Sequence, residues 1–242
     1  MNLRLAPALA ACMVASAFAL SACGETDQQF QARVRAYLLQ HPEVIQEALD
    51  KLQEKQQAQA EEAARTAIAH NRQAVEHDAR DFVANPNGTV TVTEFFDYRC
   101  PHCINAAPAV LAMIHDQPDV RVVFKEFPIF GDASDRAAAA ALAVKRAGGD
   151  YLDVYRQFMA ARPLDDAAID RVMKAHGVDP SVLDQPQEKA EIARQVADVR
   201  SLAIGLGLQG TPAFIIGDTL VPGEDMDAVK AAIQAQRAKA KG

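Results

Sequence analysis

The feature that most constrains this chain is a cysteine pair between a predicted strand and a predicted helix. Residues 90–96 are rich in β-branched and aromatic side chains, which favour a strand. Cys-Pro-His-Cys follows at residues 100–103, and residues 106–115 suit a helix in which Pro108 introduces a bend. A strand that leads into Cys-x-x-Cys at the start of a helix predicts a redox-active pair within an α/β domain.

The residues of this motif supply the means to lower the pKa of a thiol. Disulfide exchange requires a thiolate, and the N-terminus of a helix favours negative charge through its free N–H groups and its dipole. Cys100 falls at this junction, Pro101 presets the first helical turn, and His102 can add positive charge near the sulfur. We therefore predict that Cys100 is the nucleophile and that Cys103, one turn later, resolves the mixed disulfide.

Three other interpretations of the pair are weaker. A zinc site needs two more ligands at suitable spacing, but the mature chain predicted below has no other cysteine and its histidines are scattered. A structural disulfide across two residues closes too small a loop to add much stability. Inert core cysteines are not expected directly after a strand and before Pro-His. No metal and no cofactor are predicted.

The first 22 residues are predicted to be a signal peptide. Arg4 precedes an Ala/Leu-rich run to Leu20 that is too short and too rich in alanine for a membrane span. Leu-Ser-Ala-Cys at residues 20–23 is similar to a bacterial lipobox, in which Cys23 would be lipidated and become the new N-terminus. The alternative is an ordinary cleaved signal that happens to precede a cysteine. The lipobox interpretation predicts a periplasmic protein that is lipid-anchored to a cell-envelope membrane.

The four cysteines of the chain are then accounted for. Cys12 leaves with the signal peptide and Cys23 carries the lipid, so Cys100 and Cys103 are the only thiols of the mature chain. An exported protein meets an oxidising environment. A single close pair in that environment, with no other disulfide, indicates that the pair serves chemistry and not the stability of the fold.

The charge of the chain argues against nucleic acid as a partner. The formal net charge is −7, and no basic patch is evident in the sequence. Binding to phosphates would require clustered lysines and arginines. The 242 residues suffice for one full domain and an appendage, and half of them are apolar.

Residues 23–84 are predicted to form a helical arm. They contain one proline, Pro42, which suits the first turn of a second helix, and residues 54–65 are too polar to belong to a core. The arm is either a solvated spacer or an oligomerisation segment, because an apolar stripe outside a core needs a partner. Apolar residues of the stripe recur at helical spacing: Val34, Tyr37, Leu38, Val44, Ile45, Ala48, Leu49 and Leu52.

Residues 85–242 are predicted to form the catalytic domain, which begins at an Asn-Pro-Asn-Gly turn. A second strand at residues 120–124 follows the first helix, and this order implies a right-handed parallel crossover. Residues 132–206 read as a helical insertion. Its predicted helices are residues 137–147, 151–160, 166–176 and 187–206. A hairpin at residues 213–221 and a final helix at residues 225–238 follow the insertion.

Three motifs resemble the DsbA-like branch of the thioredoxin superfamily. Residues 95–103 look like its active-site stretch, where Cys-Pro-His-Cys is typical, and Gly-Thr-Pro-Ala-Phe at residues 210–214 looks like its cis-proline loop. Lys-Glu-Phe-Pro at residues 125–128 matches its second strand and the start of its insertion. The resemblance implies an α/β thioredoxin fold with an inserted helical domain, here preceded by a long N-terminal helical arm.

The resemblance also implies an activity and further site residues. The activity is dithiol–disulfide oxidoreduction on cysteines of exported proteins, with a membrane redox partner that is DsbB-like or DsbD-like. Thr211 and Pro212 would face the cysteines and pair with an extended substrate strand. Glu94 corresponds to a buried acid that takes or relays the proton of Cys103, although a satisfied core carboxylate is the alternative interpretation.

The arm resembles the long N-terminal segment of ScsC-type relatives. In those proteins the segment makes trimers and favours disulfide isomerase activity, whereas Cys-Pro-His-Cys favours an oxidase. The direction of electron flow therefore stays open between oxidation, isomerisation and reduction. A non-catalytic alternative is an envelope chaperone or scaffold that binds extended peptides, and the presence of both cysteines disfavours it.

Overall fold

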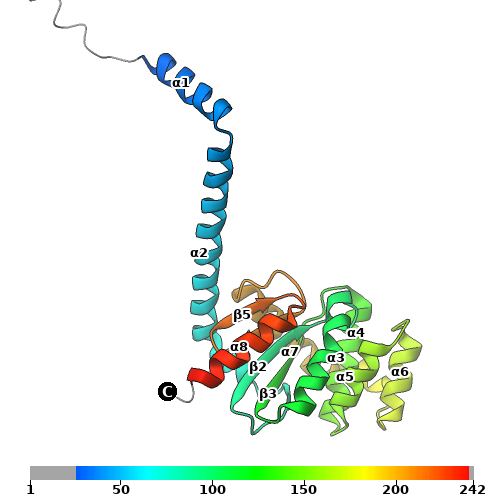
Figure 1. Cartoon of the computed structure of the whole chain (residues 1–242). Helices are drawn as coiled ribbons and strands as arrows, with labels where there is room; N and C mark the ends of the chain where they lie inside the picture. Colours follow the sequence, from blue (N-terminus) through cyan, green and yellow to red (C-terminus); the bar gives the residue numbers. More distant parts are fainter. Residues whose placement is uncertain (1–25, 240–242) are drawn as a thin grey trace, which may run out of the picture. The chain divides into compact units, whose positions relative to one another are not determined.

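The computed structural model describes residues 26–239 and divides the chain into two compact units, residues 1–57 and 58–242 (Figure 1). The predicted signal peptide, residues 1–22, and the predicted lipidation site Cys23 lie outside the described residues. Each unit has its own architecture.

The first unit contains helix α1 (Asp27–Gln40) and the beginning of helix α2 (Glu43–Glu76). Thr26 caps α1: its hydroxyl accepts a hydrogen bond from the backbone N–H of Gln29, and the Gln29 side chain accepts one from the N–H of Thr26. Pro42 lies directly before α2, where its missing N–H costs nothing. Two helices are therefore present where the arm was predicted to have them.

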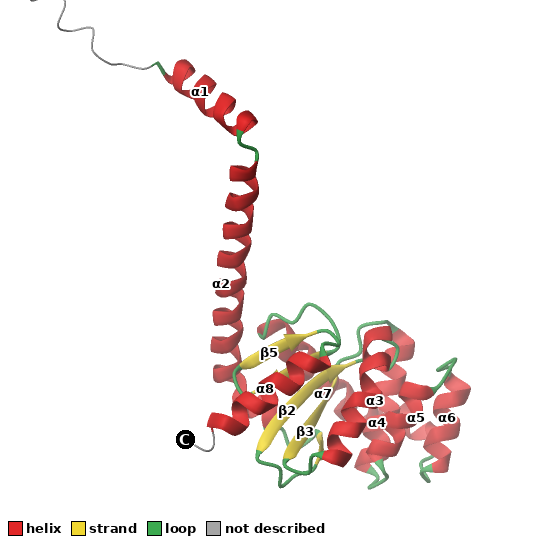
Figure 2. Ribbon diagram, in the orientation of Figure 1, coloured by secondary structure: helices red, strands yellow, loops and turns green. Residues whose placement is uncertain are grey.

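The second unit is built on a five-stranded sheet with the order β1-β3-β2-β4-β5 (Figure 2). Strands β2 and β3 are parallel and joined through helix α3, which confirms the predicted crossover, whereas the other pairs are antiparallel. The strands are β1 (Phe82–Ala84), β2 (Val90–Phe96), β3 (Val120–Glu126), β4 (Ala213–Ile216) and β5 (Thr219–Pro222).

Strand β1 corrects the predicted course of the chain. We expected residues up to 84 to belong to the arm, but Phe82, Val83 and Ala84 pair with Phe124, Val123 and Val122 of β3. A strand of three residues is too short to show an alternating pattern, and only its partner identifies it. The sheet therefore begins before the Asn-Pro-Asn-Gly turn.

Helices cover both faces of the sheet. Apolar residues of α3 and α8 pack on one face, and Ile68 and Val75 of α2 pack with α7 on the other. The predicted helical insertion is present between β3 and β4. The remaining helices are α3 (Pro101–Asp116), α4 (Asp132–Arg146), α5 (Tyr151–Ala160), α6 (Asp166–Ala175), the 3-10 helix η1 (Pro180–Asp184), α7 (Pro186–Gly205) and α8 (Met226–Lys239).

Candidate active site

The cysteine pair lies at the end of β2, where the chain enters α3. Cys100 has an extended backbone and is the N-cap of α3, Pro101 is its first residue, and Cys103 lies in its first turn. Both cysteines are free thiols with buried side chains. Pro108 lies inside α3 and does not end it. The predicted junction of strand and helix thus places both sulfurs at the positive end of a helix dipole.

Hydrogen bonds to the Cys100 sulfur favour its thiolate. The hydrogen bond with the Cys103 thiol is the largest cause, and the backbone groups of Cys103 and His102 act in the same direction. Together they lower the Cys100 pKa to about 5, although burial opposes them. In the protonated form, the Cys100 thiol donates to the carbonyl oxygen of Thr211 at 3.1 Å. Cys100 is therefore ionised at neutral pH, as an exchange nucleophile must be.

Cys103 has the opposite environment. Burial raises the pKa of its thiol well above the ordinary range, and its hydrogen bond to Cys100 and the nearby carboxyl of Glu94 act in the same direction. Its side chain is fully buried. Cys100 is thus ionised and its negative charge is stabilised by its neighbours, while Cys103 keeps its proton until a base removes it.

Glu94 is fully buried on β2. The hydroxyl of Tyr155 on α5 donates to both of its carboxyl oxygens, at 3.2 and 3.3 Å. Burial raises the Glu94 pKa to about 8, although the hydrogen bond from Tyr155 opposes this change. A buried carboxyl with a pKa near neutrality can accept and return a proton.

The loop that contains Thr211 and Pro212 brings a third segment to the site. The peptide bond between these two residues is cis, and strand β4 begins at the next residue, Ala213. The Thr211 hydroxyl oxygen is buried and has no hydrogen-bond partner among the described residues. The predicted proximity of this loop to Cys100 is thus present in the fold.

His102 lies at the surface of the site. Its Nδ1 is 3.1 Å from a carboxyl oxygen of Glu224, in the loop between β5 and α8. The hydrogen bond and charge of Glu224 raise the His102 pKa. The imidazole therefore carries positive charge over a wider pH range beside the Cys100 thiolate.

Two buried acids near the pair were missed by reasoning from the sequence. The Asp97 carboxylate accepts hydrogen bonds from the backbone N–H groups of Ile129 and Phe130 and from the Ser134 hydroxyl, at 2.7, 3.1 and 2.8 Å. It thereby fastens the loop before Cys100 to the start of the insertion. Glu126 of β3 is likewise buried. Acidic residues within otherwise apolar stretches were the available signal for both.

The described residues 26–239 contain no group of three or more His, Cys, Asp or Glu side chains arranged to hold a metal ion. Within the same residues, no helix is both long and apolar enough to cross a membrane.

Comparison with known proteins agrees with this geometry. Residues 91–234 match the family described as the DSBA-like thioredoxin domain. The chain belongs to this family of DsbA-like thioredoxin domains. Residues 28–59 match the N-terminal domain of the copper resistance protein ScsC, so the similarity extends into the arm.

Individual relatives include a sequence and two solved structures. The thiol:disulfide interchange protein DsbA of Bordetella pertussis is 29% identical over 136 residues, which are 54% of this chain and 64% of that protein. A thioredoxin-like oxidoreductase from Silicibacter pomeroyi is 36% identical with a TM-score of 0.64, covering 69% of this chain and 98% of the other. Proteus mirabilis ScsC in a transitional conformation is 30% identical with a TM-score of 0.65, and the match covers 88% of this chain and 97% of that chain.

Proposed function

We propose that this protein is a thiol–disulfide oxidoreductase that exchanges disulfides with cysteines of exported proteins. The observation that carries the proposal is the contrast within one helical turn: the Cys100 pKa is lowered to about 5, and the pKa of Cys103 is raised. A metal site or a structural disulfide would not need this difference. Membership of the DsbA-like family supports the same activity.

The reaction proceeds in two exchanges. The Cys100 thiolate attacks one sulfur of a substrate disulfide, so a mixed disulfide forms and the other substrate sulfur leaves as a thiolate. Cys103 then loses its proton and attacks the Cys100 sulfur, which forms the Cys100–Cys103 disulfide and releases the second substrate thiolate. Two electrons pass from the cysteine pair to the substrate. Oxidation of a substrate dithiol follows the same steps in reverse.

Glu94 is the proposed acceptor of the Cys103 proton. Its carboxyl raises the pKa of Cys103, which indicates that the two groups interact through the interior. With a pKa of about 8, Glu94 binds a proton tightly enough to take it and loosely enough to return it. The same group donates the proton back when the Cys100–Cys103 disulfide is opened.

Thr211 and Pro212 are proposed to hold the substrate. The Thr211 carbonyl lies 3.1 Å from the Cys100 sulfur, so a peptide that reacts at Cys100 must pass beside this loop. Thr211 lies two residues before β4, next to the sulfur, and its backbone is proposed to pair with an extended segment. Substrates are therefore recognised through main-chain hydrogen bonds, which suits a range of unfolded exported proteins.

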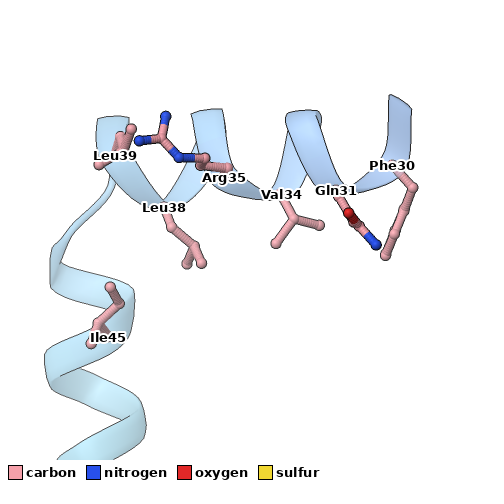
Figure 3. A pocket seen from close by; sticks show the side chains of 7 residues that line it. All are labelled: Phe30, Gln31, Val34, Arg35, Leu38, Leu39 and Ile45. Atoms are coloured by element: carbon pink, nitrogen blue, oxygen red, sulfur yellow. The ribbon is translucent and has the colours of Figure 1, made fainter. Parts of the chain in front are cut away.

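The arm is proposed to be an oligomerisation segment that forms a trimer, as the ScsC resemblance implies. Val34, Ile45, Leu49 and Leu52 are 40 to 50% exposed in the single chain. Figure 3 shows Val34 and Leu38 projecting from the same side of α1, with Ile45 in the first turn of α2; these residues line a shallow apolar groove. An apolar surface of this kind is stabilised when copies of the chain cover it.

Export and anchoring are proposed from the N-terminal sequence. The protein would be periplasmic, with lipidated Cys23 holding it to a cell-envelope membrane and a DsbB-like or DsbD-like membrane protein restoring its redox state. Replacement of Cys23 with Ala should release the protein into the soluble envelope fraction. Continued membrane association of the Cys23→Ala variant would contradict the lipid anchor.

Replacement of Cys103 with Ser tests the exchange mechanism. The variant cannot resolve the mixed disulfide, so envelope proteins should stay bound to Cys100 and be released by a reductant. The double variant Cys100→Ser/Cys103→Ser is the matched control and should trap none. Equal yields from the two variants would contradict the mechanism. Thiol trapping of the wild-type pair in cells then separates an oxidase, which is mostly oxidised, from an isomerase or reductase, which is mostly reduced.

A further inference from the structure

The sheet register places a second buried acid beside Glu94. Strands β2 and β3 are parallel, Glu94 pairs with Phe124, and Phe96 pairs with Glu126. Glu94 and Glu126 therefore lie on the same face of adjacent strands, offset by two residues, which puts their backbone positions about 8 Å apart. Both side chains are buried.

Helix α5 binds both acids through one pair of tyrosines. Tyr151 donates its hydroxyl hydrogen to Glu126 at 2.6 Å, and Tyr155, four residues later on the same helical face, donates to Glu94 at 3.2 Å. Tyr98, two residues before Cys100, donates to the same Glu126 oxygen at 2.8 Å. One helix thus spans the two carboxyls, and the loop before the nucleophile contacts the second of them.

We propose that Glu126 is a positioning residue for thiol exchange, which sets how tightly Glu94 holds the proton taken from Cys103. Glu126 touches neither cysteine and acts through its neighbour. When Glu126 is ionised, its charge opposes ionisation of Glu94, and when it is protonated this repulsion is absent. The inference rests on the role of Glu94 given under the proposed function.

The charges around Glu126 support this coupling. Burial raises the Glu126 pKa to about 8, the hydrogen bonds from Tyr151 and Tyr98 oppose this, and the carboxylates of Asp97 and Glu94 raise it further. These groups come from α5, from the loop before α3, and from β2. The titratable groups that face Glu94 are Tyr155 of α5, Cys103 of α3, Tyr98 of the loop before α3 and Glu126 of β3.

Two interacting acids of similar proton affinity titrate as a pair, in two separate steps. At the spacing of the two strands, ionisation of one acid should change the proton affinity of the other by about tenfold, or roughly one pH unit. Removal of Glu126 should therefore leave Glu94 with a single step at lower pH. The resolution step at Cys103 should follow that change.

The experiment uses the reduced full chain and oxidised glutathione. Acid-quenched samples separate the glutathione mixed disulfide at Cys100 from the closed Cys100–Cys103 disulfide, and the rate of closure is measured against pH. We expect the midpoint of this profile to move about one pH unit lower in Glu126→Gln. An unchanged midpoint in a variant that folds and forms the mixed disulfide normally would overturn the inference.

Infrared absorption of protonated buried carboxyls provides a second measurement that does not depend on catalysis. Buried Asp81, whose pKa is raised to about 6, contributes its own step in every variant. Beside that step, the wild type should show two and Glu126→Gln one. Tyr151→Phe should move the two steps further apart, because Glu126 loses a hydrogen bond to its ionised form. If Glu126 has only a structural role, the Cys100–Cys103 disulfide should close more slowly in Glu126→Gln and Tyr151→Phe, with no shift in the pH profile of closure or in the infrared titration. If Glu94→Gln closes with the wild-type pH profile, the proposed role of Glu94 fails, and the infrared steps still decide the coupling.

Discussion

The arm and the redox unit distribute apolar and charged side chains in opposite ways. In the arm, Ile45, Leu49 and Leu52 are about half exposed, and the Lys51–Glu54 ion pair lies in solvent. In the redox unit, Glu94 and Glu126 are buried, and Lys125 of β3 is buried in an ion pair with Asp81. A core defines the second unit, whereas residues 26–57, the described part of the first, contain no buried residue in the single chain.

This contrast indicates what stabilises each region. Buried polar groups are tolerated only when hydrogen-bonded or paired, so those of the redox unit must be held by the fold around them. Exposed apolar groups gain stability only when another surface covers them. The redox unit buries its own core, whereas the apolar stripe of the arm is exposed in the single chain, which is why we propose that copies of the chain cover it.

The largest expected effect comes from removing the exposed apolar surface of the arm. Ile45→Lys combined with Leu49→Lys places charges on the apolar stripe and should convert the proposed oligomer into a monomer, as measured by light scattering. Exchange on a small dithiol peptide should be unchanged, because the site lies wholly in the other unit. Glu47→Lys, on the opposite side of α2, is the matched control and should keep the native mass. An unchanged mass in the double variant would refute self-association through this stripe.

The next effect concerns the buried ion pair. Asp81→Asn leaves the Lys125 ammonium buried with the carbonyl of Ala74 as its remaining partner. Loss of one member of a buried pair costs about 3–5 kcal/mol of unfolding free energy. Urea unfolding of the variant should show this loss, with little change in the slope of unfolding free energy against urea concentration. A change within experimental error would mean that water or a rearranged side chain satisfies the ammonium.

The third effect is the pH dependence of the reduced form. The ordinary pKa of a cysteine thiol is 9.0, and the folded, reduced protein lowers that of Cys100 to about 5. A lowered pKa stabilises the fold fully above pH 9, and the gain is lost as the pH falls to about 5. At pH 7 it amounts to roughly 3 kcal/mol. Unfolding of the reduced wild type and of reduced Cys100→Ser should therefore converge toward pH 5, and a constant difference would disprove the lowered pKa.

The smallest effect is expected at the exposed pair of the arm. Glu54→Gln makes the same chemical change as Asp81→Asn, an acid to its amide beside a lysine, but both side chains are more than 65% exposed. Such pairs contribute about 0–1 kcal/mol. Unfolding free energy and mass should both stay close to wild type. A loss comparable to that of Asp81→Asn would show that the pair is buried between copies of the chain.

Local chemistry made much of the site predictable. The strand before Cys100 and the helix after it follow from residue types close in sequence, so the cysteine pair was found before the fold. The cis-proline loop with Pro212 was predicted from the resemblance to the DsbA-like family, because a proline between a threonine and an apolar strand is unremarkable by itself. The helices of the insertion were located by their spacing and by the glycines and prolines between them. Strand β1 was missed because its three residues are too few to show a strand pattern, and only their pairing with β3 identifies them as a strand.

What the sequence by itself determined is the pair of thiols, the elements that flank them and the apolar stripe of the arm, because propensity and periodicity act over a few residues. What only the tertiary structure decided is how the thiols are tuned. Glu224 meets His102 across 122 positions, Thr211 meets Cys100 across 111, and Glu126 meets Tyr98 across 28. Burial and hydrogen bonding shift a pKa through neighbours in space, and the folded sheet and its helices supply those neighbours.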